Sequence, residues 1–350
     1  GPPSITSCQS DINDANTSDD DYGDCNTAVS YTVTADGNPS PSYSYEFTGA
    51  TTGTGSGTGS GSAFNKGTTD VTVTATNTHG TATCSFSVTV SDNENPTVTA
   101  ASNVTANTSD DGTGDCATDV AIPDATFGDN CSGSSLTWTM SGATTGSGSG
   151  QVGTYYFAEG TTTIDYTVTD ASSLTANDQL TVSVTDNELP TVVTQDVTLE
   201  LDASGSASIT VNDIDNGSSD NCSIATRELS QTTFSCSETG DNTVTLTVTD
   251  VNGNVNSAEA TVTIEDNTAP TVLTMDNTIA LDQNGSATLT PDMVDDGTYD
   301  NCSFTRTVTP SSFGCNNIGL NSVIFLATDA SGNQTIGSAM VDVVDNLPPE

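Results

Sequence analysis

The sequence predicts an all-β chain of four β-sandwiches arranged in tandem, and two repeated features lead to that prediction. The first is an Asp-Asn pair that stands shortly before a proline and recurs at intervals of 94, 80 and 79 residues. The second is a glycine that precedes a run of alternating apolar and hydroxyl residues once in every repeat. Such internal repeats decide a domain count more firmly than the length of 350 residues does.

The Asp-Asn pairs mark the junctions between repeats. Each Asp-Asn pair follows an alternating strand, and each proline precedes the next one. Because proline interrupts strand pairing, the two strands belong to different repeats. The junctions are Asp92-Asn93-Glu94-Asn95-Pro96, Asp186-Asn187-Glu188-Leu189-Pro190, Asp266-Asn267-Thr268-Ala269-Pro270 and Asp345-Asn346-Leu347-Pro348. They divide the chain into predicted domains at 1–92, 93–186, 187–266 and 267–346, with 347–350 starting a further linker.

The invariant glycine introduces a long strand inside each repeat. In the first repeat Val71, Val73 and Ala75 face one way and the intervening threonines face the other, a period of two that fits a half-buried antiparallel strand. No segment has the pattern of an amphipathic helix. Short strands separated by Gly, Asn and Asp are typical of a Greek-key sandwich. The four glycines are Gly67, Gly160, Gly240 and Gly319.

The repeats fall into two subtypes. The first two share Gly/Ser-rich stretches at 49–62 and 142–150, whereas the last two share Leu201-Asp202-Ala203-Ser204-Gly205 and Leu281-Asp282-Gln283-Asn284-Gly285. The Gly/Ser stretches lie inside a repeat, ahead of the invariant glycine. Their position favours hairpins or flexible loops over linkers between domains.

The strongly negative charge of the chain excludes nucleic acid as a partner and calls for salt or bound cations. With 46 acidic and only 3 basic residues the formal net charge is -43, which is incompatible with binding a nucleic-acid backbone. So acidic a chain repels itself when compact and needs salt or bound cations. No apolar run is long enough to span a membrane. Gly1-Pro2-Pro3 is not the start of a signal peptide, so we expect a mature or excised segment.

Oxygen-bearing side chains at fixed places in the repeats predict calcium sites. Calcium takes six to eight hard oxygen ligands, while nine cysteines without a CxxC pair and a single histidine argue against zinc. In a Greek-key sandwich the junctions and alternate loops gather at the domain ends. Junction carboxylates would therefore meet the end loops of the neighbouring domain around one ion, much as in cadherins. The alternative is that Asp and Asn merely suit turns.

Three sequence patterns supply the predicted ligands: the junction pairs, an Asp-Asn pair before cysteine, and a Thr-Asp-x-x-Gly-Asn turn. The predicted metal ligands are Asp92, Asn93, Asp129, Asn130, Asp186, Asn187, Asp220, Asn221, Asp250, Asn254, Asp266, Asn267, Asp300, Asn301, Asp329, Asn333, Asp345 and Asn346.

Several motifs resemble those of a known domain family. Cys8-Gln9-Ser10-Asp11-Ile12 is similar to the opening of hyalin-repeat (HYR) domains, and residues 64–73 with Cys84-Ser85-Phe86 resemble the closing half of that domain. The last two repeats resemble related repeats of secreted Bacteroidetes proteins through residues 215–222 and Thr249-Asp250-Val251-Asn252-Gly253-Asn254. The resemblance implies an immunoglobulin-like fold, export from the cell, and a role in adhesion or surface architecture, but no chemistry.

The nine cysteines imply disulfides and hence an oxidising compartment. The resemblance implies a bond between Cys8 and Cys84, on the first and last strands of the first repeat. In the other repeats the only two cysteines are expected to pair locally. These pairs are Cys116 with Cys131, Cys222 with Cys236, and Cys302 with Cys315. Cys25 is then unpaired, either as a buried free thiol or bonded to another chain or to a missing segment.

No catalytic motif stands out: phosphate-cradling loops, histidine metal motifs and nucleophile elbows are missing from the sequence, so we expect no enzyme. We expect an extracellular structural protein of a bacterial surface, an elongated rod within a calcium-stabilised filament or adhesin stalk. Its partners would be copies of itself arranged head to tail or further repeats of the same polypeptide. The alternative is a non-catalytic module of a larger secreted protein that binds carbohydrate or another surface, with cell-surface or matrix glycans as partners.

Overall fold

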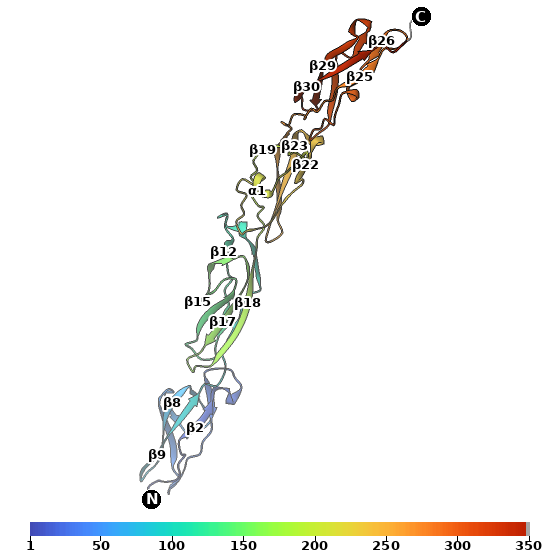
Figure 1. Ribbon diagram of the computed structural model, residues 1–350. Helices are drawn as coiled ribbons and strands as arrows, with labels where there is room; N and C mark the ends of the chain where they lie inside the picture. Colours follow the sequence, from blue (N-terminus) through green and yellow to red (C-terminus); the bar gives the residue numbers. More distant parts are fainter. Residues whose placement is uncertain (348–350) are drawn as a thin grey trace. The chain divides into compact units, whose positions relative to one another are not determined.

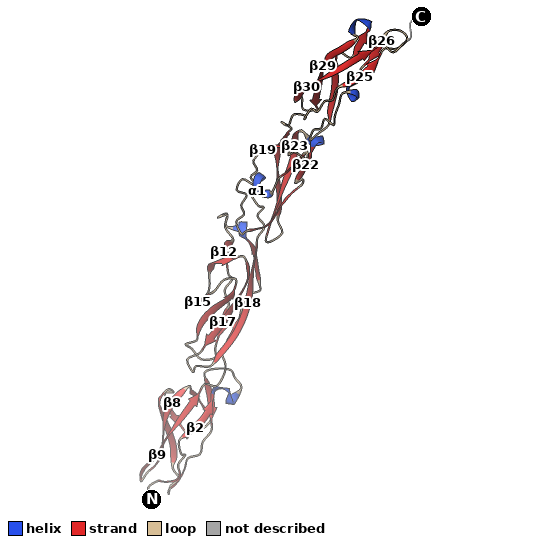
Figure 2. Ribbon diagram, in the orientation of Figure 1, coloured by secondary structure: helices blue, strands red, loops and turns tan. Residues whose placement is uncertain are grey.

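The computed structural model describes residues 1–347, and nearly all of its regular structure is β-strand (Figure 1, Figure 2). The chain forms two compact units, Gly1–Asp186 and Asn187–Glu350, each of which holds two sandwiches. Helical segments in the described residues are single turns of three or four residues. The prediction of tandem immunoglobulin-like β-sandwiches is therefore confirmed.

The first sandwich is built on a five-stranded sheet in the order β2-β9-β8-β5-β6, and the pairs β1-β4 and β3-β7 supply the opposing layer. As the alternation predicts, β8 buries Val71, Val73 and Ala75 and leaves the intervening threonines at least partly exposed. The elements are β1 (Ser4–Ser7), β2 (Ile12–Asn16), η1 (Thr17–Asp20), β3 (Asn26–Val29), β4 (Thr34–Asp36), β5 (Ser42–Gly49), β6 (Gly53–Ser56), β7 (Ser62–Asn65), β8 (Gly67–Asn77) and β9 (Gly80–Ser91).

The second sandwich repeats this plan with the sheet β11-β18-β17-β14-β15 and the pairs β10-β13 and β12-β16. Its core surrounds Trp138, the only tryptophan of the chain, together with the fully buried Tyr166 and Phe157. The elements are β10 (Thr97–Thr99), β11 (Val104–Asn107), η2 (Thr108–Asp110), β12 (Ala117–Ala121), β13 (Thr126–Gly128), β14 (Ser135–Gly142), β15 (Gly146–Ser149), β16 (Thr154–Ala158), β17 (Gly160–Thr169) and β18 (Thr175–Thr185).

The third sandwich has a four-stranded sheet in the order β19-β24-β23-β21 and the pair β20-β22. Isolated bridges, such as that between Thr194 and Asp215, take the place of further strands. The elements are β19 (Val197–Glu200), β20 (Ser206–Ser208), α1 (Val211–Ile214), β21 (Ile224–Leu229), β22 (Thr233–Ser235), η3 (Cys236–Glu238), β23 (Gly240–Asp250) and β24 (Val255–Glu265).

The fourth sandwich follows the plan of the third, with the sheet β25-β30-β29-β27 and the pair β26-β28. The two sheet plans match the two subtypes that the sequence predicts. In all four sandwiches an early strand pairs in parallel with the last strand, which ties the start of each repeat to its end. The elements are β25 (Asn277–Ala280), β26 (Ser286–Thr288), η4 (Pro291–Met293), β27 (Phe304–Thr309), β28 (Ser312–Gly314), η5 (Cys315–Asn317), β29 (Gly319–Asp329) and β30 (Gln334–Val344).

The invariant glycines begin the long strands β8, β17, β23 and β29, and the backbone explains why glycine is needed there. Their φ angles lie between +102° and +113°, a region that side-chain-bearing residues rarely adopt. The chain turns at this residue and then enters the longest antiparallel pairing of its sandwich. A side chain at this position would strain the start of the central strand.

The Gly/Ser stretches form edge hairpin strands, β6 and β15, in agreement with the hairpin prediction. A Cβ atom placed on Gly55 would lie 2.6 Å from the ring of Tyr45, and one placed on Gly148 would lie 2.4 Å from the ring of Trp138. These glycines therefore allow the edge strand to lie directly on an aromatic ring.

Candidate metal centres at two joints

The disulfides define where neighbouring sandwiches meet within a unit. Cys8 bonds to Cys84 inside the first sandwich, as the resemblance implies. Cys25 of the first sandwich bonds to Cys131 of the second, and Cys236 of the third bonds to Cys302 of the fourth. We call the region around the Cys25–Cys131 bond the first joint and the region around the Cys236–Cys302 bond the second joint.

The predicted local pairings Cys116–Cys131, Cys222–Cys236 and Cys302–Cys315 are wrong, and so is the prediction of an unpaired Cys25. Cys116 and Cys222 are disulfide-bonded, and the free cysteine within the described chain is Cys315, which is exposed. The physical reason is that at each joint the Asp-Asn-Cys loop lies at the end of its sandwich that faces the preceding one. Its cysteine therefore reaches a neighbour more readily than a residue of its own repeat.

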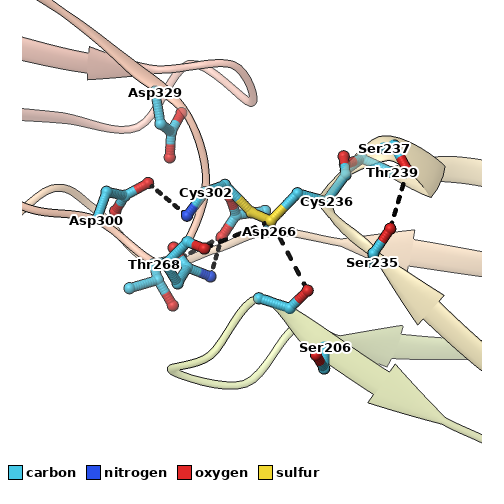
Figure 3. The surroundings of a disulfide bond; sticks show 12 residues. Ser206, Ser235, Cys236, Ser237, Thr239, Asp266, Thr268, Asp300, Cys302 and Asp329 are labelled. Carbon is cyan, nitrogen blue, oxygen red and sulfur yellow. Dashed lines mark hydrogen bonds between the residues drawn. A yellow bond between two sulfur atoms is a disulfide. The ribbon is translucent and has the colours of Figure 1, made fainter.

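The second joint brings three carboxylates together. Asp266 follows β24 and leads into the fourth sandwich, Asp300 lies in the loop before β27, and Asp329 ends β29. One carboxylate oxygen from each of them lies within 4.8 Å of those of the other two. Figure 3 shows Asp300 and Asp329 on the fourth sandwich and Asp266 close to the disulfide. The fold thus brings one junction carboxylate and two end-loop carboxylates of the predicted ligand set together.

Hydrogen bonds hold this cluster in place. The side-chain amide of Asn333 donates to Asp329 Oδ2 at 2.8 Å and to the backbone carbonyl of Asp266 at 2.8 Å. The side-chain amide of Asn301 donates to Asp266 Oδ1 at 3.0 Å. The backbone N–H of Cys302 donates to Asp300 Oδ2 at 3.2 Å. These contacts occupy one carboxylate oxygen each of Asp266 and Asp300, whereas both oxygens of Asp329 accept hydrogen bonds from Asn333.

Three buried oxygen atoms of the second joint have no hydrogen-bond partner among residues 1–347: Asp266 Oδ2, Asp300 Oδ1 and Asn301 Oδ1. Buried polar atoms are normally satisfied, so such a group requires a physical explanation. Two unit charges about 5 Å apart repel by about 3 kcal/mol at an effective dielectric constant of about 20. Burial raises the pKa of Asp300, and the charges of Asp266 and Asp329 raise it further.

This donor set fits a calcium ion. Oxygen ligands on opposite sides of calcium lie about 4.8 Å apart, because each Ca–O bond is about 2.4 Å long. Carboxylate and amide oxygens on loops are the ligands that calcium takes, whereas zinc would call for histidine or thiolate. Asp266, Asp300, Asp329 and Asn301 are the residues that would hold it, and its charge would offset their mutual repulsion.

The first joint repeats the arrangement with one difference. Asp92, Asp129 and the sulfur of Cys131 each place an atom within 4.8 Å of the other two, but this sulfur is oxidised and cannot act as a thiolate ligand. Lys66 Nζ lies 3.2 Å from Asp92 Oδ2, and the hydroxyl of Ser172 donates to the same oxygen at 3.1 Å. Burial would raise the pKa of Asp92, but the hydrogen bond and charge of Lys66 hold it below its ordinary value.

The first joint also has buried oxygens without a partner in the described part of the chain: Asp129 Oδ1, Asn130 Oδ1 and Asp170 Oδ2. Asp170 occupies the turn between β17 and β18, where its other oxygen accepts the N–H groups of Ser172 and Leu174. Neither Asp170 nor Lys66 is among the ligands that the sequence patterns predict. Asp170 follows a Thr-Val-Thr run, as Asp250 does, but lacks the Gly-Asn that comes after Asp250. Nothing in the sequence indicates where the side chain of Lys66 points.

The remaining predicted ligands divide into inward and outward positions. Asp186 is buried and accepts a hydrogen bond from the hydroxyl of Thr108, whereas Asn93, Asn187 and Asn267 are exposed. The side chain of Asn267 donates to two glutamates, away from the cluster. At each of these three junctions the aspartate is thus buried and the asparagine is exposed.

The other end-loop residues repeat the second-joint geometry within their own sandwich. Asp250 accepts two contacts from Asn254, as Asp329 does from Asn333, and Asp220 accepts the N–H of Cys222, as Asp300 does from Cys302. The side-chain amide of Asn221 donates to Glu188. Asp345 and Asn346 are exposed.

No known protein family matches the sequence, and no curated protein matches it. Solved structures similar to it include Sidekick-1 immunoglobulin domains 1–5, at 9% identity, a TM-score of 0.34, and coverage of 98% of this chain and 81% of that one. The extracellular domain of protocadherin GammaB4 is 13% identical, with a TM-score of 0.32 and coverage of 98% and 67%. At these scores the likenesses add nothing to the fold that the strand pairings establish. Within residues 1–347 no helix has the length and apolarity to cross a membrane.

Proposed function

We propose that this chain is an extracellular structural segment, part of a filament or adhesin stalk, whose sandwich-to-sandwich joints are locked by disulfides and stabilised by calcium. The observation that carries the proposal is the set of buried oxygens without partners, Asp266 Oδ2, Asp300 Oδ1 and Asn301 Oδ1, beside the Cys236–Cys302 bond. Disulfides imply an oxidising compartment, which supports a secreted or cell-surface location, here on a bacterium.

Mechanically, the disulfide and the ion would restrict different motions of the same joint. A disulfide limits how far the two sandwiches can separate, but rotation about its bonds leaves the angle between them variable. An ion bound by Asp266 on the linker and by Asp300 and Asp329 on the next sandwich would restrict that angle. We keep the four domain boundaries at residues 92, 186, 266 and 346 as part of this proposal, because each falls at an Asp-Asn pair that follows the last long strand of a sandwich.

The test is a thermal unfolding curve of the full chain in millimolar calcium and then in excess chelator. Calcium that binds the folded state at 100 times its dissociation constant stabilises that state by about 2.7 kcal/mol. We expect a clear fall in Tm on chelation, and only a small recovery with magnesium at equal concentration, because magnesium demands a smaller and more regular octahedral site. Identical melting curves in calcium and in chelator would contradict calcium stabilisation.

A second candidate, a non-catalytic module that binds another surface, is favoured by the outward sheet face of the fourth sandwich. On β29 and β30, Leu320, Ile324 and Ile336 are exposed by 72%, 53% and 69%. The corresponding positions on β23 and β24 of the third sandwich hold Asp241, Thr245 and Ser257. Large exposed apolar patches mark interaction surfaces.

The chemistry of this face is aliphatic. The exposed tyrosines, Tyr22, Tyr156 and Tyr299, belong to three different sandwiches and form no stacking platform for a sugar ring. A glycan array with the full chain tests carbohydrate binding directly. Binding that Ile324→Thr and Ile336→Thr abolish would favour the module over the purely structural role.

A further inference from the structure

The end of the third sandwich that faces the fourth is a docking surface for an Asp-Asn-Cys loop. Asn301 donates from its side-chain amide to the backbone carbonyl of Asp202 at 3.3 Å, and its own carbonyl lies 3.5 Å from the sulfur of Cys236. A Cβ atom on Gly205 would lie 2.6 Å from that carbonyl, so glycine is what allows the loop to approach. The surface thus consists of the 202–205 turn, Cys236 and Asp266.

The fourth sandwich carries the same turn at its own far end. Asp282 Oδ1 accepts the N–H groups of Asn284 and Ser286 at 2.8 and 3.0 Å. Asp202 Oδ1 accepts the two equivalent N–H groups at the same distances, 2.8 and 3.0 Å. Gly285 has a φ of +70°, close to the +73° of Gly205.

The cysteine and the junction aspartate also correspond. The sulfur of Cys315 lies 3.8 Å from the carbonyl of Gly285, and that of Cys236 lies 3.7 Å from the carbonyl of Gly205. Asp345 Oδ1 accepts the N–H of Leu347, just as Asp266 Oδ1 accepts that of Thr268. The two sandwich ends differ in solvent exposure. Asp266 is only 5% exposed, because the loop that carries Asn301 lies over it, whereas Asp345 and Cys315 are exposed.

We propose that this end of the fourth sandwich, formed by the 282–285 turn, Cys315 and Asp345, docks an Asp-Asn-Cys loop of a further sandwich domain and bonds covalently to its cysteine. The inference names the partner within the proposed structural role and rests on that role. The second joint provides the precedent, because the same surface is seen there with its loop in place.

The chemistry of the loop narrows the partner. The first sandwich of this chain does not fit, because β4 and β13 hold equivalent places and Pro39 stands where Cys131 does. The three Asp-Asn-Cys loops of the chain end in Cys131, Cys222 and Cys302, all of which are already disulfide-bonded. The partner is therefore a sandwich whose Asp-Asn-Cys loop still carries a thiol, and not the first sandwich of a second copy.

The bond forms by thiol–disulfide exchange. The two thiols become one disulfide, and their two hydrogens and two electrons pass to a small-molecule disulfide such as oxidised glutathione, which leaves as two thiols. An oxidising compartment supplies that acceptor. Docking contributes by holding the incoming sulfur next to Cys315.

The test equilibrates the full chain with a probe peptide of the sequence Thr-Tyr-Asp-Asn-Cys-Ser-Phe, which is that of residues 298–304, in a glutathione redox buffer containing chelator. Mass spectrometry counts the mixed disulfide at Cys315. We expect the peptide to be preferred about fivefold over the same peptide with alanine in place of its Asp and Asn, since about one net hydrogen bond separates the two. Equal occupancy by both peptides would overturn the inference.

Two variants keep the result interpretable. Cys315→Ser removes the adduct and locates it. Gly285→Ala adds a Cβ atom 2.9 Å from the sulfur of Cys315 and, by analogy with Gly205, in the path of the incoming loop, so we expect it to abolish the preference between peptides. Reaction of Cys315 with glutathione in this variant is the control that the thiol itself stays accessible. A retained preference in Gly285→Ala also counts against the docking surface. Because chelator is present throughout, the outcome is independent of whether calcium stabilises the joints.

Discussion

Both joints hold carboxylates close together between two sandwiches, and they differ in whether a cationic side chain lies beside those carboxylates. Both place a junction aspartate beside an Asp-Asn-Cys loop and lock it with a disulfide between sandwiches. In the first joint Lys66 provides a cation on the protein itself, in contact with Asp92. In the second joint Asp266, Asp300 and Asp329 lie together, and none of the three forms an ion pair within residues 1–347.

The titration behaviour of the two joints reflects that difference. Burial would raise the pKa of Asp92, but hydrogen bonds from Lys66, the backbone N–H of Glu94 and Ser172, together with the charge of Lys66, lower it. The pKa of Asp300 is raised, because burial and two neighbouring carboxylates all disfavour its charge. The ammonium of Lys66 lies in contact with Asp92 in the first joint. If calcium stabilises the joints as proposed, the second joint should depend on it more strongly than the first. The two joints share a junction aspartate, an Asp-Asn-Cys loop and a disulfide, yet this difference in charge predicts that they respond unequally to calcium.

The largest effect is expected from removing a joint disulfide. The chain-entropy model gives about 4 kcal/mol for the 66-residue separation of Cys236 and Cys302, and about 5 kcal/mol for the 106 residues between Cys25 and Cys131. In chelator, we expect Cys236→Ser/Cys302→Ser to expose residues 266–271 to hydrogen exchange, because the carboxylates then repel without restraint. We expect Cys25→Ser/Cys131→Ser to protect residues 92–97 better, because Lys66 remains bound to Asp92.

Calcium is the matched control for this pair of variants. Adding it should restore protection around the second joint much more than around the first. Equal exchange at both junctions, in chelator and in calcium alike, would show that Lys66 makes no difference and would break the comparison.

A smaller effect on stability is expected from Asp300→Asn, and its sign should differ between chelator and calcium. In chelator the substitution removes one of three mutually repelling charges and keeps an oxygen that can accept from the N–H of Cys302, so the second unit should become more stable. In calcium it removes a charged ligand, so most of the stabilisation of about 2.7 kcal/mol expected at 100 times the dissociation constant should be lost. Hydrogen exchange of residues 187–347 measures both changes.

The control for Asp300→Asn is Asp296→Asn, an exposed aspartate on the same sandwich. It changes the net charge equally but should shift stability in the same direction with or without calcium. If Asp300→Asn behaves in the same way, the cluster is a solvated turn and no metal centre.

The sequence was sufficient for much of this architecture because the signals involved are local. Period-two alternation around Val71 and a glycine such as Gly67 with positive φ report the backbone of their own strand. The inward position of the junction aspartates also follows from their place directly after the last buried strand. Asp92 and Asp266 are 9% and 5% exposed.

The disulfides and the composition of the joints could not be predicted in the same way, since they depend on which ends of successive sandwiches meet. Counting cysteines per repeat favoured local pairs such as Cys302–Cys315, whereas the true partner of Cys302 is 66 residues away in the preceding sandwich. Lys66 lies next to the invariant Gly67, but only the folded chain brings it to Asp92. Contacts between repeats leave no periodic pattern within a repeat.

The smallest effect, and the sharpest test of the comparison, is expected from Lys66→Met. In chelator the substitution leaves the buried Asp92 with only hydroxyl and backbone partners, so the first unit should lose stability. The Lys66→Met variant should bind calcium at the first joint about tenfold more tightly than the unchanged protein does. The reason is that a unit positive charge and a divalent cation about 5 Å apart repel by about 1.7 kcal/mol even in bulk water. Trp138, buried in the second sandwich, reports the unfolding of this unit by fluorescence.

Lys66→Arg is the control for Lys66→Met, because it keeps the charge and should behave like the unchanged protein. If the calcium-induced rise in Tm is the same for Lys66→Met and Lys66→Arg, the ammonium does not substitute for metal, and the two joints differ in sequence without differing in function.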